Sequence, residues 1–189
     1  GTLGDMQVTD SKIAITDLDI QSDTVNSKID VSVALKGPLQ TALKVLDGKP
    51  LQYPKKLGLD TSEVAGDAAV KVNFKFPLYK NLAVTDVKVT ADAALKDVML
   101  KSVVAGFPLS GGPMDVAVEK GTMTVKGSGY RGEMPVTFNW LRNFNDGADV
   151  AAKITAKLPL TGAALVKFGV PEDFKATGTL PADVTYTET

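Results

Sequence analysis

Three glycines, Gly127, Gly129 and Gly132, stand in the spacing G-x-G-x-x-G of a dinucleotide-binding turn. Such a turn needs a strand before it and a helix after it, because the pyrophosphate binds at the helix N-terminus. The residues after Gly132, "EMPVTFNW", instead alternate between apolar and polar side chains, which predicts a strand. We therefore interpret the three glycines as a bend between two strands, where missing side chains permit unusual backbone angles or the close approach of a neighbour.

Two groups of carboxylates are the next candidates for a site. Asp17, Asp19 and Asp23 match three positions of a calcium loop, but Ser22 stands at the position of its glycine and Lys28 at the position of its bidentate glutamate. We therefore expect solvated acids at a strand end rather than a calcium site.

The adjacent carboxylates Glu172 and Asp173 resemble an acid/base pair only superficially, because neighbouring acids on a loop are usually exposed. Three cations, Lys126, Arg131 and Arg142, would meet a phosphate head group if their strands were neighbours. Scattered surface cations are the favoured interpretation, since such side chains are routinely solvated.

Composition narrows the function further. The chain has 189 residues and 44% apolar content, with neither histidine nor cysteine. The absence of histidine excludes catalytic sites in which histidine activates a serine or cysteine, and metal centres with histidine ligands. The absence of cysteine excludes thiolate metal centres and disulfides. A net charge of -1 provides no field that would gather nucleic acid. We predict no enzyme activity, no cofactor and no metal.

Most of the chain alternates with a period of two. In "SKIDVSVALKG", apolar side chains from Ile29 to Leu35 alternate with polar or small ones, and the pattern recurs in 70–76, 86–95, 114–125 and 148–158. One apolar and one polar side per strand predicts a mainly β protein with an antiparallel sheet. Asn145 to Gly147, "NDG", predicts a hairpin between two of the strands.

Two segments, 38–46 and 160–169, instead have helical spacing, and 53–59 suggests a further turn. Each helix follows an alternating strand and the dipeptide Pro-Leu, so two similar strand-helix-strand units are predicted, at about 25–76 and 148–187. Two unrelated edge helices are the alternative, because short periodic segments resemble each other easily.

The predicted inward faces carry small residues, among them Ala91, Ala93, Ala152 and Ala156. Small inward residues leave volume to be filled. Two interpretations remain open: the short helices pack down on this face, or the face is an apolar groove for an extended hydrophobic ligand.

Two runs, "LGLDTSEVAGDAAVKVNFKFPL" and "ALKDVMLKSVVAGFPLSGGPMDVAVEKGTMTVKGSGYRGEMPVTFNW", resemble the AsmA-like superfamily of bacterial envelope proteins, particularly its YhdP-like branch. The resemblance covers roughly residues 35–189. It implies a curled antiparallel sheet with a hydrophobic inner groove, two or three short helices, and one β-rich segment, 1–189, of a longer periplasmic protein anchored in the inner membrane. Members of this kind look like bridges that carry phospholipid to the outer membrane.

The resemblance transfers no catalytic residue and gives the groove only as inward positions. No run of the chain approaches the roughly 20 apolar residues of a membrane span, and its start is not typical of a signal peptide. We therefore expect phospholipid acyl chains as partners, an anchor elsewhere in the parent protein, and possible self-association through sheet edges.

The alternative is a structural or protein-interaction module with a closed, helix-filled core. The predicted groove positions are Val87, Val89, Ala91, Ala93, Leu95, Val116, Val118, Val136, Phe138, Ile154 and Leu158.

Overall fold

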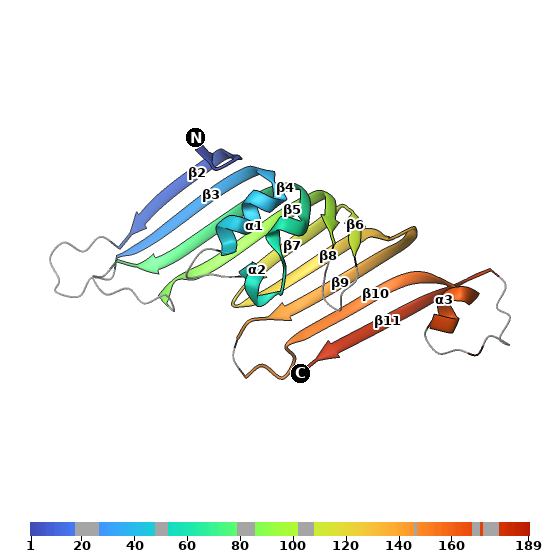
Figure 1. Ribbon diagram of the computed structural model, residues 1–189. Coiled ribbons are helices and arrows are strands. Elements are labelled where there is room, and N and C mark those ends of the chain that lie inside the picture. Colours follow the sequence, from blue (N-terminus) through green and yellow to red (C-terminus); the bar gives the residue numbers. More distant parts are fainter. Residues whose placement is uncertain are drawn as a thin grey trace.

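The chain forms one antiparallel sheet of eleven strands, seen in the computed structural model in Figure 1. The structure describes residues 1–17, 27–47, 53–78, 86–101, 108–145, 147–167, 171 and 178–189. The strands are β1 (Thr2–Leu3), β2 (Met6–Thr16), β3 (Lys28–Pro38), β4 (Val64–Pro77), β5 (Lys88–Leu100), β6 (Leu109–Gly111), β7 (Met114–Glu119), β8 (Thr122–Arg131), β9 (Met134–Asn143), β10 (Ala152–Thr161) and β11 (Thr179–Glu188). The predicted mainly β, antiparallel class is confirmed.

The strands follow one another across the sheet in chain order, so the two termini lie at opposite edges (Figure 1). Near the middle, β5 pairs with β6 at one end and with β7 further along. Each strand thus pairs with its sequence neighbour, as short connections between antiparallel strands favour.

Short helices accompany the sheet in the described part of the chain: α1 (Leu39–Asp47), α2 (Tyr53–Lys56), the 3-10 turn η1 (Thr61–Glu63) and α3 (Gly162–Lys167). The prediction of a helix over 38–46 and a turn within 53–59 is confirmed. The third helix is shorter than predicted, because Leu160 and Thr161 pair with β11 and continue β10. Of its predicted end, 168 and 169 lie outside the described residues.

Both predicted strand-helix-strand units have the same order in space. β3 leads into α1 and its chain returns as β4, which pairs with β3; β10 leads into α3 and its chain returns as β11, which pairs with β10. That they are two similar units, rather than two unrelated edge helices, stays a prediction.

The core lies in one layer between the sheet and the first two helices. Leu39 and Ala42 of α1 are buried against strand residues that include Met6, Val98 and Met114, each at most 2% exposed. Figure 1 shows α1 and α2 in front of the middle strands. The middle of the sheet is therefore the best-packed part of the described fold.

The glycine motif is a hairpin, as predicted. Gly132 has a φ of +63° in the turn between β8 and β9, while Gly127 and Gly129 lie within β8. A Cβ on Gly127 would lie 2.6 Å from the carbonyl oxygen of Pro113, and one on Gly129 would lie 2.6 Å from that of Ser110. These two glycines allow neighbouring backbone to approach closely.

Gly127→Ala is expected to destabilise the protein by about 1–3 kcal/mol, because the added methyl group meets backbone that cannot rotate away. Ser128→Ala, on the same strand, is the control and should change stability by less than about 0.5 kcal/mol. Urea unfolding followed by circular dichroism measures both. Equal midpoints for the two variants would contradict the close-approach explanation.

Candidate functional site

The strand register places the apolar side chains on one side of the sheet, called here the apolar face. Cross-strand partners continue it from strand to strand, for example Val33 with Val72 and Ala93 with Val116. Residues one position away along each strand form the opposite, polar face. The apolar face comprises Ile13 and Ile15 of β2, Ile29, Val31, Val33 and Leu35 of β3, Ala68, Val70, Val72, Phe74 and Phe76 of β4, Val89, Ala91, Ala93 and Leu95 of β5, Met114, Val116 and Val118 of β7, Met123 and Val125 of β8, Val136, Phe138 and Trp140 of β9, Ala152, Ile154, Ala156, Leu158 and Leu160 of β10, and Leu180, Ala182, Val184 and Tyr186 of β11.

The predicted groove positions fall together on this face. Val87 lies just before β5, and the remaining ones lie within β5, β7, β9 and β10: Val89, Ala91, Ala93, Leu95, Val116, Val118, Val136, Phe138, Ile154 and Leu158. Alternation alone was enough to group them. Whether they line a ligand groove stays a prediction.

The middle of the apolar face is covered. Leu95 is buried, and Ala93, Val116 and Val118 pack against the core cluster to which α1 contributes Leu39 and Ala42. The interpretation in which helices pack on the small inward residues therefore describes this part. Ala152 is also fully buried, at 0% exposed.

Away from Met6 and Val8, which pack in the core at the start of β2, the outer strands leave the same face open. On β2, Ile13 is 68% exposed and Ile15 is exposed as well. On β11, Leu180, Val184 and Tyr186 are exposed, with Val184 at 41%. Exposed apolar side chains that continue a buried apolar face mark a surface that associates with something apolar.

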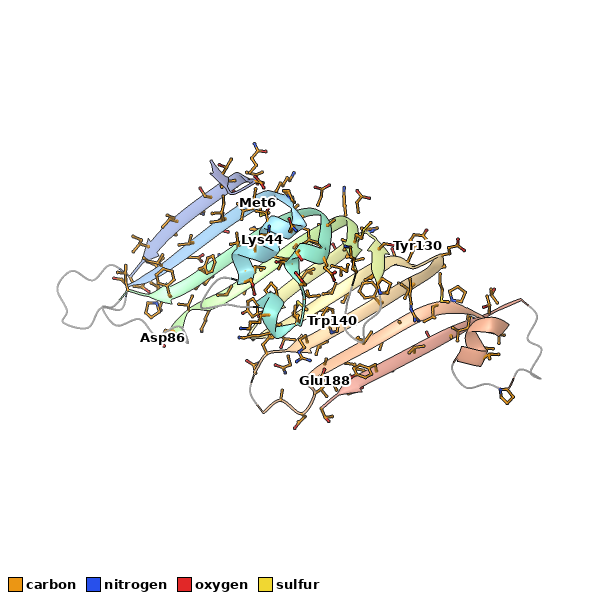
Figure 2. All side chains as sticks on the ribbon, viewed as in Figure 1. Met6, Lys44, Asp86, Tyr130, Trp140 and Glu188 are labelled. Atoms are coloured by element: carbon orange, nitrogen blue, oxygen red, sulfur yellow. The ribbon has the colours of Figure 1, made fainter. Side chains whose placement is uncertain are left out.

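One end of the apolar face on the last three strands is charged. Arg142 of β9 and Glu188 of β11 both pair in register with Ala152 of β10, which lies between them. Because Ala152 has only a methyl side chain, the Arg142 Nη1 donates to Glu188 Oε2 across it at 2.7 Å. Trp140 lies one row further in, and Figure 2 shows it near the same end of the sheet as Glu188.

The three cations considered for a phosphate site do not meet. Lys126 lies on the polar face of β8, Arg131 at the turn end of β8, and Arg142 at the opposite end of the hairpin on the apolar face. A shared head-group site for these three residues is therefore wrong, since the register separates them.

Two hollows lie on the polar face of the described strands. One, of about 620 Å³, is lined by residues of β2, β3, β4, β5, β7 and β8; the other, of about 690 Å³, is lined by residues of β7 to β11. Both include Asp115 and Lys126. The lining of the first combines small and charged side chains: Ala34, Ala69, Ala94, Ala117, Lys36, Lys71, Asp92, Asp115 and Lys126.

Sequence reasoning missed these hollows, because it looked for volume on the apolar side. The signal was present in the alternation: Ala34, Ala69, Ala94 and Ala117 occupy polar-face positions of adjacent strands, where small side chains leave the surface low.

A polar cluster on β3 and β4 favours the ionised form of the Asp30 carboxyl group. Lys75 Nζ lies 3.0 Å from Asp30 Oδ2, and Asn73 Nδ2 donates to Asp30 Oδ1 at 2.6 Å. These contacts, first that of Lys75 and then that of Asn73, hold the pKa of Asp30 below its ordinary value of 3.8.

The lowered pKa of Asp30 predicts that the stability of the protein depends slightly on pH in the acidic range. The contribution of Asp30 is fully present above the unfolded pKa and is lost as the pH falls through the lower folded pKa. Asp30→Asn should therefore be less stable than the wild type at pH 6, with the difference shrinking as the pH falls below 3.8, the ordinary pKa of the group. Urea midpoints across this range measure it; a difference that grows in acid would contradict the assignment.

The other acids considered for metal or catalytic sites are only partly described. Asp17 is described, and its carboxylate lies 3.7 Å from Lys28 Nζ. Ser22, Asp19, Asp23, Glu172 and Asp173 lie outside the described residues. Within the described ranges, no group of three potential metal ligands comes together.

Comparisons of the chain with protein-family models, with curated proteins and with solved structures give no match. Among the described helices, none has the length and hydropathy needed to cross a membrane.

Proposed function

We propose that this chain is a non-catalytic, lipid-binding segment of a longer periplasmic protein, anchored in the inner membrane, that carries phospholipid between the inner and outer membranes. The observation that carries the proposal is the continuous apolar face, which remains exposed on the outer strands β2 and β11. The resemblance to the AsmA-like superfamily supplies the compartment and the class of ligand.

The physical basis is the transfer of acyl chains from water to this face. Each buried methylene contributes about 0.8 kcal/mol, so an acyl chain is held without specific hydrogen bonds. Ten strand positions, at about 4.8 Å each, give a sheet roughly 45 Å across, which is longer than one acyl layer of a bilayer. Chains can therefore lie along the sheet while their head groups remain in water.

A second candidate is a structural or protein-interaction module of the cell envelope. The packing of α1 and α2 over the middle strands favours it, because there the apolar face is already filled from within the chain. The long outer edge of β11 would then pair with a strand of another segment.

Val184→Asp tests the lipid proposal on the open part of the face. Val184 is exposed on β11, so a charge there should reduce phospholipid uptake several-fold while leaving stability within about 1 kcal/mol of the wild type. Thr185→Asp is the matched control, since it places the same charge one residue along the strand on the polar face. Uptake of a fluorescent phospholipid by the purified protein measures both.

Native mass spectrometry and lipid extraction of the purified protein provide an independent measurement. Phospholipid retained through washing, with mixed head groups, agrees with a face that binds the acyl chains of many phospholipids. A lipid-free protein that takes up no fluorescent phospholipid, or equal uptake by both aspartate variants, would favour the interaction module.

A further inference from the structure

We propose that the Arg142 end of β9, β10 and β11 binds the oxyanion head of an amphiphile whose tail lies along the apolar face. This inference rests on the proposed function and deepens it by giving the bound molecule a direction. The head chemistry is a carboxylate or phosphate oxygen, and the tail is a hydrocarbon.

The distribution of charge on these three strands defines the direction. Along their apolar face, Arg142 and Glu188 are the charged side chains. Both pair with Ala152 and so belong to the same row, that is, the same set of cross-strand partners, at the end of the three strands. The rows beyond them are apolar: Trp140, Ile154 and Tyr186, then Phe138, Ala156 and Val184, then Leu158 and Ala182, then Leu160 and Leu180. From Ala152 to Leu160 this track is about 26 Å long at 3.3 Å per residue.

Unpaired donors stand at the charged end. Trp140 is 8% exposed, and its indole Nε1 has no hydrogen-bond partner among the described residues. The Nε of Arg142 is also buried and has no hydrogen-bond partner among the described residues. Residues 140 and 142 project to the same side of β9. Two N–H donors on one side of the strand therefore lack the hydrogen-bond acceptor that buried donors in proteins normally have. An oxygen atom of a bound head group would supply it.

Arg142 also has room for a second acceptor. Its guanidinium carries five N–H donors, and Nη1 is the one that contacts Glu188. A quarter of the Arg142 side chain and 40% of the Glu188 side chain are exposed, so the pair is reachable from solvent. An incoming oxyanion would compete with Glu188 for the guanidinium, as its planar fork suits carboxylate and phosphate oxygens alike.

This competition gives two substitutions opposite effects. Arg142→Gln should weaken the binding of hexadecanoic acid roughly tenfold, because a charge-assisted hydrogen bond is lost. Glu188→Gln should strengthen it several-fold, because the competing carboxylate is removed. Neither should change the binding of hexadecanol. Lys153→Gln is the control, since it removes a positive charge beside Ala152 on the polar face.

The orientation of the bound amphiphile can be measured in the wild-type protein by tryptophan fluorescence, because Trp140 is the single tryptophan of the chain. Hexadecanoic acid brominated next to its carboxyl group should quench Trp140 fluorescence more strongly than acid brominated at the far end. Stronger quenching by the far-end bromine would overturn the proposed direction.

The outcomes separate this inference from the proposed function. Acid and alcohol that bind equally well, with Arg142→Gln changing neither, would leave lipid binding intact and overturn the head-group site, with the donors then satisfied by water. Binding of inorganic phosphate alone, at the same affinity as the acid and without competition by phospholipid, would likewise overturn it. Failure of every amphiphile and of phospholipid to bind would overturn the proposed function itself.

Discussion

The structure depends on one constraint, the period of two along strands that are held in register by a continuous antiparallel ladder. Because the register carries apolar positions of one strand opposite apolar positions of the next, a single layer collects them on one face. The helices that the chain supplies are short, and α1, the longest of them, spans nine residues. They cover the middle of the face and Met6 at the start of β2, but Ile13 and Ile15 of β2 and Leu180, Val184 and Tyr186 of β11 stay exposed. The core is therefore central, and the exposed apolar side chains are peripheral.

Small residues decide what happens on either side of this layer. Gly127 and Gly129 allow neighbouring backbone to approach β8, and Ala152 allows an ion pair to form across β10. On the polar face, alanines such as Ala69 and Ala94 lower the surface into hollows. Each of these effects comes from a missing side chain rather than from an added functional group.

The alternation could be predicted from sequence because it is a local property. Runs such as Ile29 to Leu35 define their own faces, and adjacent strands in the chain are adjacent in the sheet. The same reasoning failed where pairing with a distant segment decides the outcome. Leu160 and Thr161 have helical spacing but join β10, since β11 offers a backbone partner for each.

The charged end of the apolar face was beyond sequence reasoning for a related reason. Arg142 and Glu188 are 46 residues apart, and their contact requires the register of three strands together with the methyl side chain between them. The hollows likewise combine side chains from several strands. A single sequence identifies the face of each position but not which distant positions share a row.

A single-layered sheet in chain order also has consequences for cooperativity. The extensive contacts of each long strand are with its immediate neighbours, so the stabilising free energy is distributed along one dimension, as in repeat proteins. The middle strands are additionally tied together by α1, whereas β2 and β11 have a neighbour on one side over most of their length. Amide hydrogens should therefore exchange by fraying inward from the two edges, with β4 and β5 the last to open.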